Sequence, residues 1–457
     1  MIKFAARAGM TIRVSTGLED LGAPDRMSTT SFFYAMPGDR LHLLDVRYLF
    51  NVATYSPEVN EKFIYTYSYQ PDQNWTKYNG DLSEDSFRHD DYIFSQPCYF
   101  RLCFKRVDGA DFSDSDADVV NEIISFVQEA QVTPAADVKP FIAEECTKLL
   151  YRIEKNRTED SLLFALLADT HFTINGTWDD TLASLKAVHE KEKFDGIIHL
   201  GDFTDGLVTA AATKQYADCV INDLNSMGVP LFITIGNHDA NYFKNNPEPF
   251  SLGEQCRLYL SHSDSYTVRE PDSPWYYKDF HEHGMRFVFL HSFDHTRMHR
   301  YVYTTNCLRW LERTLADTPD GYDILIFNHL APLVRLQYWA TRIYGCKKLV
   351  DILEGVNAGS QEGKILAFIN GHNHTDLIYN GLSFPVVSIG CSKTEYFTNY
   401  KPRGAYTPKR RLGETTQELW DAFIVTPKER RLDFLRFGAG DDRVINENMC
   451  YCLPREG

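Results

Sequence analysis

Hydrophobic and polar positions alternate in two different ways along this chain. Between Ser31 and Gly109, short runs of alternating aromatic and β-branched residues, such as Phe63 to Tyr69, are separated by turn residues such as Pro71 and Asp72. A period of two residues is typical of antiparallel strands with one buried face. We therefore predict an all-β sandwich domain over residues 1–109.

The pattern changes after residue 110. Residues 110–160 are acidic, and within them residues 141–151 carry apolar side chains near helical spacing, which predicts a helical connector. From residue 161, short buried runs interleave with amphipathic segments, which predicts an α/β domain over 161–457. Strands are expected at 162–168, 196–200, 231–235, 287–290, 324–327, 365–369, 384–389, 419–425 and 431–437, and helices at 181–193, 213–227 and 307–315.

Five of the predicted strands are followed by residue types that can bind metal ions. Loops that follow strands gather at one edge of an α/β fold, so we expect these side chains to meet at one site. Carboxylate, amide and imidazole ligands without thiolate suit Mn, Fe, Zn, Co or Ni and argue against a structural zinc site. The five blocks are Asp169-Thr170-His171, Gly201-Asp202, Gly236-Asn237-His238-Asp239, Asn328-His329 and Gly371-His372-Asn373-His374.

Glycine precedes the candidate ligand in three of the blocks, at Gly201, Gly236 and Gly371. Without a side chain, glycine allows a sharp turn and a close approach of backbone to an ion or a phosphate. These positions therefore predict tight loops at the site.

The ordered series D-x-H, G-D, G-N-H-D, a lone His and G-H-x-H resembles the signature of the calcineurin-like metallophosphoesterase family at every block, over about residues 162–438. The resemblance implies a β-sandwich flanked by helices and a pair of divalent metal ions. It implies that Asp202 bridges the ions and that His238 protonates the leaving group while a hydroxide activated by two metals attacks in line. The implied ligands are Asp169, His171, Asp202 and His374 for one ion, and Asp202, Asn237, His329 and His372 for the other.

Several side chains beside the blocks have two interpretations. His199 is either a simple strand residue or a partner of a ligand, and Asp205 and Asp239 either orient ligands or complete turns. His291, His295 and His299 form either a wall on the substrate side or an exposed loop. The aromatic residues that follow the blocks either stack on a base or sugar or merely exclude water; they are Phe172, Trp178, Tyr242 and Phe243.

Charge and cysteine content narrow the possible partners. The net charge of −16 disfavours general binding to nucleic acid, although a nuclease could still have a local basic groove. The dense basic stretch from Lys401 to Arg411 is either a solvated loop or a contact to substrate phosphate. The ten cysteines include no CxxC pair, so we expect free thiols rather than disulfides or a zinc site.

Location is predicted from the apolar content of the sequence. It has no run of about 18 apolar residues, so we expect no membrane span. Lys3 and Arg7 interrupt the segment that an export peptide would need, and we expect a cytoplasmic protein.

Together these features predict a metal-dependent phosphoric ester hydrolase acting on phosphodiesters or phosphomonoesters, with a lean toward diesters. The alternatives are a nuclease of the same family and a binding or scaffold protein that kept the fold without catalysis. The region around Phe50 to Ala53 and Tyr99 to Phe104 also resembles small sandwich modules that precede enzymes in some bacterial and phage surface proteins. That resemblance implies a glycan or another surface polymer as a partner of the N-terminal domain.

Overall fold

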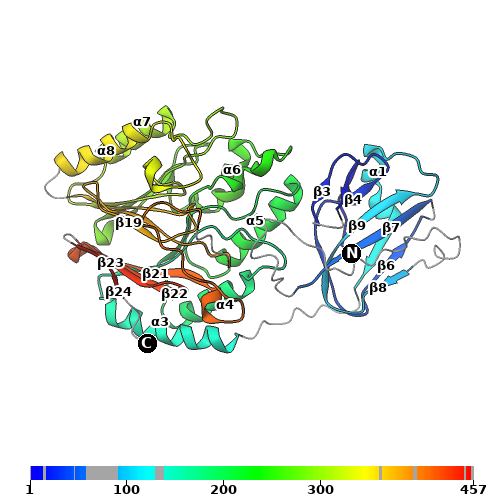
Figure 1. Ribbon diagram of the computed structural model, residues 1–457, viewed down its shortest axis with the longest axis horizontal. Coiled ribbons are helices and arrows are strands. Elements are labelled where there is room, and N and C mark those ends of the chain that lie inside the picture. The colour runs from blue at the N-terminus through cyan, green and yellow to red at the C-terminus, as the bar shows by residue number, and fades with distance from the viewer. Residues whose placement is uncertain are drawn as a thin grey trace. The chain divides into compact units, whose positions relative to one another are not determined.

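The computed structural model describes residues 2–13, 17–45, 47–57, 91–128, 138–359, 363–394, 399–446 and 449–453. The chain forms two compact units (Figure 1). The first comprises residues 1–136 with 173–176 and 207–215, and the second comprises 137–172, 177–206 and 216–457. The strand-like run predicted at Phe63 to Tyr69 lies outside the described residues.

The first unit contains antiparallel sheets, as predicted. Phe100 of the larger sheet lies with its ring centroid 5.0 Å from that of Phe126, which belongs to the smaller sheet. Aromatic contacts of this kind hold the two sheets face to face around one core. The five-stranded sheet has the order β1 (Ala6–Ala8), β4 (Met27–Thr29), β9 (Cys98–Arg106), β5 (Phe33–Ala35), and β7 (Tyr48–Tyr55) also pairs with β9. The three-stranded sheet has the order β10 (Ile124–Val127), β6 (Arg40–Leu43), β8 (Asp91–Ile93). A separate pair is formed by β2 (Thr11–Ile12) and β3 (Glu19–Asp20).

Residues 110–160, the predicted connector, divide between the two units. The short helices α1 (Asp114–Asp118) and α2 (Val120–Ile123) lead into β10, which pairs antiparallel with β6 of the first unit. The long helix α3 (Pro140–Asn156) belongs to the second unit. Its buried side chains Ile142, Cys146, Leu149 and Ile153 follow helical spacing, which explains the pattern seen in the sequence.

The second unit is built on two seven-stranded sheets. Strands β11, β12 and β13 are parallel to one another, and so are β16, β17, β18 and β20. The first sheet has the order β13 (Leu231–Ile233), β12 (Gly196–His199), β11 (Leu162–Leu167), β21 (Leu419–Thr426), β22 (Arg431–Gly438), β23 (Asp442–Asn446), β24 (Met449–Leu453). The second sheet has the order β14 (Val268–Arg269), β15 (Tyr276–Phe280), β16 (Met285–Phe289), β17 (Asp323–Asn328), β18 (Ile365–Asn370), β20 (Val386–Ser388), β19 (Leu377–Tyr379).

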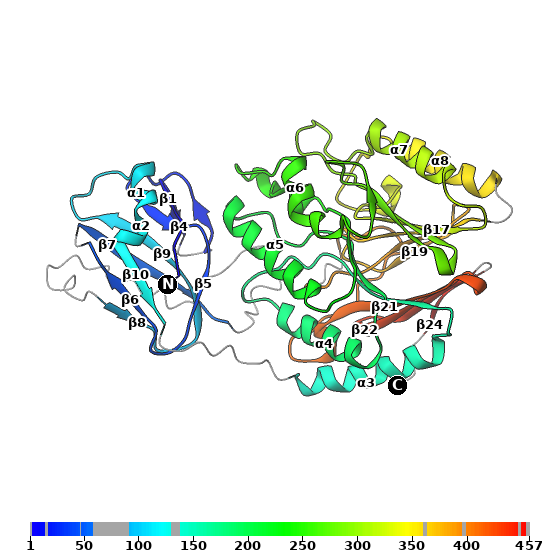
Figure 2. The same ribbon diagram turned by 180° about the vertical axis from the view of Figure 1, so that it is seen from behind.

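Aromatic side chains fill the space between these sheets. Phe164 of β11 contacts Phe287 of β16, with ring centroids 5.3 Å apart, and Phe232 of β13 stacks on Phe289 at 5.5 Å. Helices cover the outer faces: α3 and α4 (Trp178–Lys191) lie along the first sheet, and α7 (Thr305–Ala316) and α8 (Cys346–Gly359) along the second (Figures 1 and 2). The fold is thus the predicted β-sandwich flanked by helices. Two further helices are α5 (Ala210–Asn225) and α6 (Leu252–Tyr259).

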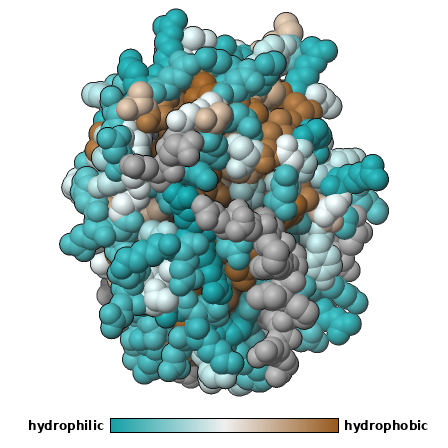
Figure 3. Space-filling model, turned by 90° about the vertical axis from the view of Figure 1, so that its left-hand side faces the viewer, coloured by the Kyte–Doolittle hydropathy of each residue, from teal (hydrophilic) through white to brown (hydrophobic). Residues whose placement is uncertain are grey.

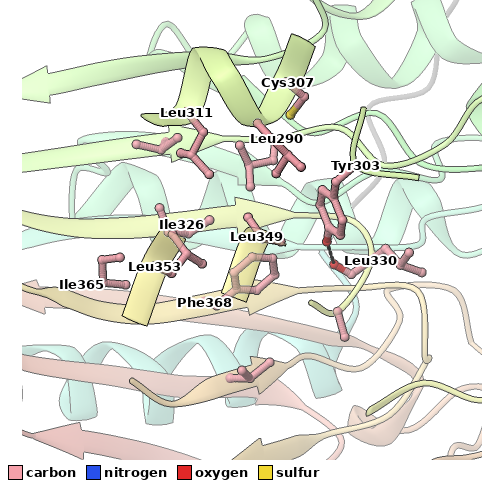
Figure 4. Close-up of a cluster of buried hydrophobic side chains, with 14 of the residues drawn as sticks. Leu290, Tyr303, Cys307, Leu311, Ile326, Leu330, Leu349, Leu353, Ile365 and Phe368 are labelled. Carbon is pink, nitrogen blue, oxygen red and sulfur yellow. Dashed lines mark hydrogen bonds between the residues drawn. The ribbon is translucent and has the colours of Figure 1, made fainter. Parts of the chain in front are cut away.

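The outer core of the second sheet is mainly aliphatic, with a few aromatic side chains (Figure 4). Leu311 of α7 and Leu353 of α8 are fully buried with Ile326 and Phe368 of the sheet below them. Burying such side chains stabilises a fold by about 1.5–3 kcal/mol each. This packing fixes β17 and β18, the two strands of this sheet that lead into predicted ligand blocks.

One face of the second unit and the state of the described cysteines complete the description. The face in Figure 3 is mainly hydrophilic, with hydrophobic residues in small patches in its upper half. None of the helices in the described parts of the chain has the length and apolarity needed to cross a bilayer. The described cysteines are free thiols: Cys98, Cys103, Cys146, Cys219, Cys256, Cys307, Cys346 and Cys391.

A buried charge network joins the two sheets of the second unit. Arg436 on β22 donates to Asp421 on β21 at 2.8 Å and to Asp376, just before β19, at 2.8 Å. Arg443 on β23 pairs with both carboxylates. Burial by itself would raise the pKa of Asp376, but the two guanidinium groups outweigh it and lower that pKa.

We expect Arg436→Met to lower the free energy of unfolding by about 3–5 kcal/mol, because two buried carboxylates then lose a fully buried partner. Urea unfolding followed by tryptophan fluorescence measures the effect. The control is Arg411→Met: its exposed pair with Glu414, at 3.6 Å, should be worth less than about 1 kcal/mol. Equal effects of the two substitutions would show that the buried network is not a major support of the fold.

Candidate metal centre

The structure brings the five predicted blocks together within the second unit. Each block directly follows a parallel strand: three follow β11, β12 and β13 of the first sheet, and two follow β17 and β18 of the second. The centre is therefore built from both halves of the sandwich. Three groups in it are suitable for holding a metal ion: Asp169, His171 and His374; His171, Asp202 and His238; and Asp202, His329 and His372.

The first predicted ligand set surrounds Asp169. His374 Nε2 lies 3.4 Å from Asp169 Oδ1, and His171 Nε2 lies 3.2 Å from His374 Nε2. The backbone N–H of His372 donates to the same carboxylate at 3.0 Å. Asp169 is thereby fixed by the loop that carries two other predicted ligands.

The second predicted set surrounds His329. Its Nε2 lies 3.1 Å from each of three atoms: Asp202 Oδ2, Asn237 Oδ1 and His372 Nδ1. Asp202 Oδ2 is also 3.9 Å from His171 Nε2, so this carboxylate lies between the two sets. That is the position predicted for the bridging residue.

These separations fit bound divalent metal ions. Ligand atoms about 2.0–2.2 Å from one ion in tetrahedral or octahedral geometry lie roughly 2.8–3.6 Å from their neighbours. The shortest contacts within each set, 3.1–3.4 Å, fall in that range. Each set could therefore hold one ion without rearrangement of the backbone.

Charge in the centre concentrates on Asp202 and His329. Burial by itself would raise the pKa of Asp202 and lower that of His329. Their mutual contact outweighs burial: His329 and His238 hold the pKa of Asp202 well below its usual value, and Asp202 raises the pKa of His329 to about 9. A site that draws protons onto an imidazole in this way also attracts metal cations, which compete with protons for the same nitrogens.

The backbone of the centre is strained. The φ angles are 54° at Asp169, 42° at His171, 58° at Asp202, 68° at His372 and 54° at His374. Residues with a side chain rarely adopt positive φ, at a cost of order 1–3 kcal/mol each, and such residues cluster at functional sites. Five of the seven predicted ligands are therefore held in a conformation that the surrounding fold must impose.

The glycines that precede ligands allow this close approach of loops. A Cβ atom on Gly371 would lie 2.7 Å from Asp169 Oδ2, and one on Gly236 would overlap the carboxylate of Asp202. Any side chain at either position would push a predicted ligand away. This agrees with the tight loops expected from the sequence.

Polar contacts at Nδ1 orient two of the imidazole rings. His171 Nδ1 lies 3.0 Å from Asp205 Oδ1, and His329 Nδ1 donates to Leu200 O at 2.7 Å. Each contact turns the Nε2 atom of its ring toward the other predicted ligands. The position of Asp205 agrees with the interpretation that it orients a predicted ligand.

Asp239 and His199 support the backbone of the ligand loops. The carboxylate of Asp239 accepts the N–H groups of Asp202, Phe203 and Gly236, all at 2.8 Å, which ties the loop after β12 to the loop after β13. His199 Nδ1 accepts the N–H of Gly201 at 3.1 Å, and its Nε2 bonds Thr170 Oγ1 at 2.7 Å. Burial lowers the pKa of His199 to about 3, so it acts as a neutral partner.

His238 differs from its neighbour Asn237. Its Nδ1 donates to Asp205 O at 2.8 Å, and its Nε2 lies 3.9 Å from Asp202 Oδ2. The ring therefore faces the space between the two sets, whereas Asn237 reaches the second set directly. The geometry also allows His238 to join His171 and Asp202 as a ligand, so proton donor and ligand are both structurally possible.

The residues beside the blocks that had two interpretations differ in burial. Phe172, Trp178 and His291 are buried in the protein interior, and Trp178 donates to Asp223 at 2.8 Å. His295 and His299 are half-buried and contact Tyr242 and Tyr344. In the basic stretch, Arg410 is buried and donates to the carbonyl oxygens of Thr416 and Cys391, which makes it a support of its own loop.

Two residues of the centre were missed from the sequence. Tyr301 places its ring 5.5 Å from that of His372, and Lys393 is buried with its Nζ 3.7 Å from Asp205 Oδ1. Both lie in irregular loops outside the five blocks. No local pattern marks them, because a lone Tyr or Lys in a loop has no characteristic spacing.

Comparison with known proteins locates the match in this part of the chain. A family model described as calcineurin-like phosphoesterase matches residues 162–376, a span that begins with β11 and includes all five blocks. A comparison with curated proteins finds no match.

Solved structures include similar folds at low identity. A dimetal phosphatase from Danio rerio is 15% identical, with 63% of this chain and 99% of that chain covered and a TM-score of 0.46. The purple acid phosphatase PPD1 from yellow lupin, Lupinus luteus, is 11% identical, with 97% of this chain and 74% of that chain covered and a TM-score of 0.44. Residues 162–376, which include all five blocks, thus match the calcineurin-like phosphoesterase family.

Proposed function

We propose that this protein hydrolyses phosphodiesters or phosphomonoesters with the help of two divalent metal ions. The observation that carries the proposal is the position of Asp202, whose carboxylate lies 3.1 Å from His329 and 3.9 Å from His171, between the two ligand sets. A carboxylate shared by two ions is characteristic of two-metal hydrolytic sites. The match of residues 162–376 to the calcineurin-like phosphoesterase family supports the same class of reaction.

The chain's own residues would divide the work as follows. Asp169, His171, Asp202 and His374 hold one ion, and Asp202, Asn237, His329 and His372 hold the other. When bound, the two ions supply Lewis-acid activation of a water molecule and neutralise charge on the phosphoryl oxygens. Asp239 and the carbonyl of Leu200 keep the ligands in place through hydrogen bonds, and Asp205 does so through its close contact with His171.

His238 is our proposed proton donor to the leaving group. Its Nδ1 is occupied by the carbonyl of Asp205, so its Nε2 is the atom that faces the reacting phosphate. Burial lowers the pKa of His238, which favours release of a proton once one is held there. A leaving alkoxide needs that proton, since an alkoxide is a poor leaving group.

The alternatives fit less well. A scaffold protein without catalysis has no need for a histidine held between two ligand sets by a bond to Asp205. A nuclease would need a basic surface for the polyanionic substrate, and the chain carries a net charge of −16. Assays of metal-loaded protein on small phosphomonoesters, small phosphodiesters and nucleic acids would separate these functions. We expect turnover of small esters, and cleavage of nucleic acid alone would overturn the proposal in favour of a nuclease.

We expect the protein to bind two transition-metal ions per chain and Asp202→Asn to weaken both sites together, because the change removes the charge that they share. Elemental analysis after dialysis against Mn or Zn measures occupancy directly. Asp264→Asn is the control, since Asp264 is an exposed partner of Arg269. Loss of a single ion in Asp202→Asn would show that this residue belongs to one site rather than to both.

We expect His238→Ala to retain both ions and to slow hydrolysis of alkyl phosphate esters by roughly 10²–10⁴-fold, the range for loss of a general acid. The loss should be much smaller for nitrophenyl esters, because nitrophenolate leaves without a proton. Asn237→Ala should instead lower metal occupancy and slow both kinds of ester. If His238→Ala loses an ion, or slows both kinds equally, then His238 is a ligand or has another role.

A further inference from the structure

Two loops meet beside His238 and form a small cationic and aromatic cluster. The guanidinium of Arg300 lies over the ring of Tyr242, 4.8 Å from its centroid. The ring centroids of His295 and Tyr242 are 5.2 Å apart. Tyr242 and His295 are half-buried, and Arg300 is exposed. Residues 290–303 thus contribute two members of the cluster and the loop after β13 contributes the third.

The cluster adjoins the metal centre at two points. Next to Tyr242 in sequence, Phe243 places its ring 4.4 Å from that of His238. Next to Arg300, Tyr301 places its ring 5.5 Å from that of His372. Tyr242 and Arg300 are thus each one residue away in sequence from a ring that contacts a histidine of the centre, and consecutive Cα atoms are only about 3.8 Å apart.

The charge of Arg300 is not neutralised by the protein nearby. Asp294, the acidic residue of the same loop, bonds Arg297 at 2.8 Å and Thr296, and the exposed Lys244 on the facing loop adds further positive charge. No described carboxylate forms an ion pair with Arg300. The cation–π contact with Tyr242 positions the guanidinium, whose N–H groups are suited to bind an anion in two-pronged fashion.

We propose that Tyr242, His295 and Arg300 form the subsite for the leaving group, and that it takes leaving groups that carry an anion, such as a carboxylate or a second phosphate. The inference rests on the proposed function, because a proton donor must lie beside the leaving oxygen, and Phe243, the neighbour of Tyr242, contacts the proposed donor His238. The chain has a net charge of −16, yet no described carboxylate pairs with this exposed arginine. Such an arginine is suited to bind an anionic group.

The test compares leaving groups that differ in charge but little in basicity. The probes are phenyl phosphate and 3-carboxyphenyl phosphate, whose meta carboxylate changes the acidity of the leaving phenol only slightly, with their methyl diesters for a diester-specific enzyme. A third probe carries a phosphate in place of the carboxylate and shows which anion is preferred. We expect kcat/KM of the wild type to favour the anionic probes at least threefold, mainly through a lower KM.

Arg300→Gln should reduce this preference to about one, and Arg300→Lys should keep part of it, since the charge remains while the planar fork is lost. Arg297→Gln is the matched control: it removes an arginine that Asp294 already pairs, three residues away on the same loop, and should leave the preference intact. Metal content and circular dichroism confirm that each variant is folded and loaded.

Two results would overturn the inference. One is a wild-type enzyme that hydrolyses probes with uncharged and with anionic leaving groups equally well. The other is a preference for the anionic leaving group that survives in Arg300→Gln. Both would leave the proposed function standing, because turnover itself is observed. Failure of the metal-loaded wild type to hydrolyse any phosphate ester would instead reject the proposed function, and the subsite with it.

Discussion

The carboxylate of Asp202 lies among three imidazoles, 3.1 Å from His329 and 3.9 Å from both His171 and His238, in a fully enclosed position. Holding a charged group there requires fixed partners, because an unpaired buried carboxylate is strongly unfavourable. Asp239 supplies much of this support by binding the N–H groups of Asp202, Phe203 and Gly236. The loops after β12 and β13 are thereby joined into one rigid element, and the rest of the centre is arranged around it.

The left-handed backbone of the ligand loops depends on the sandwich beneath them. Conformations of this kind persist only where the surroundings impose them. Paired parallel strands fix the start of each loop, the aromatic layer around Phe164 and Phe289 fixes the strands, and Arg436 fixes Asp376 two residues beyond His374. Stability of the core and precision of the site are therefore linked through a few contacts.

Much of this was predictable from sequence, for identifiable reasons. The five blocks stand out because metal-binding residue types directly follow apolar runs, and the topology then brings strand ends together. The role of β10 was not predictable, because Ile123 and Ile124 continue an apolar helical pattern and only the partner strand β6 makes Ile124–Val127 a strand. Trp178 and His291 follow or adjoin the site in sequence, yet both side chains are buried, which a position beside a block does not reveal. Contacts such as that of Arg300 with Tyr242 join positions far apart in the chain and leave no periodic signal.

The pairing of β11 with β21 has a consequence for biosynthesis. Asp169 and His171 follow β11, and one neighbour of that strand, β21, spans Leu419–Thr426 near the other end of the chain. At about 5–20 residues per second, the ribosome makes β21 on the order of ten to fifty seconds after Asp169. The loop that carries Asp169 and His171 therefore lacks one neighbouring strand until β21 has been synthesised, and we expect its left-handed backbone to form only after that point.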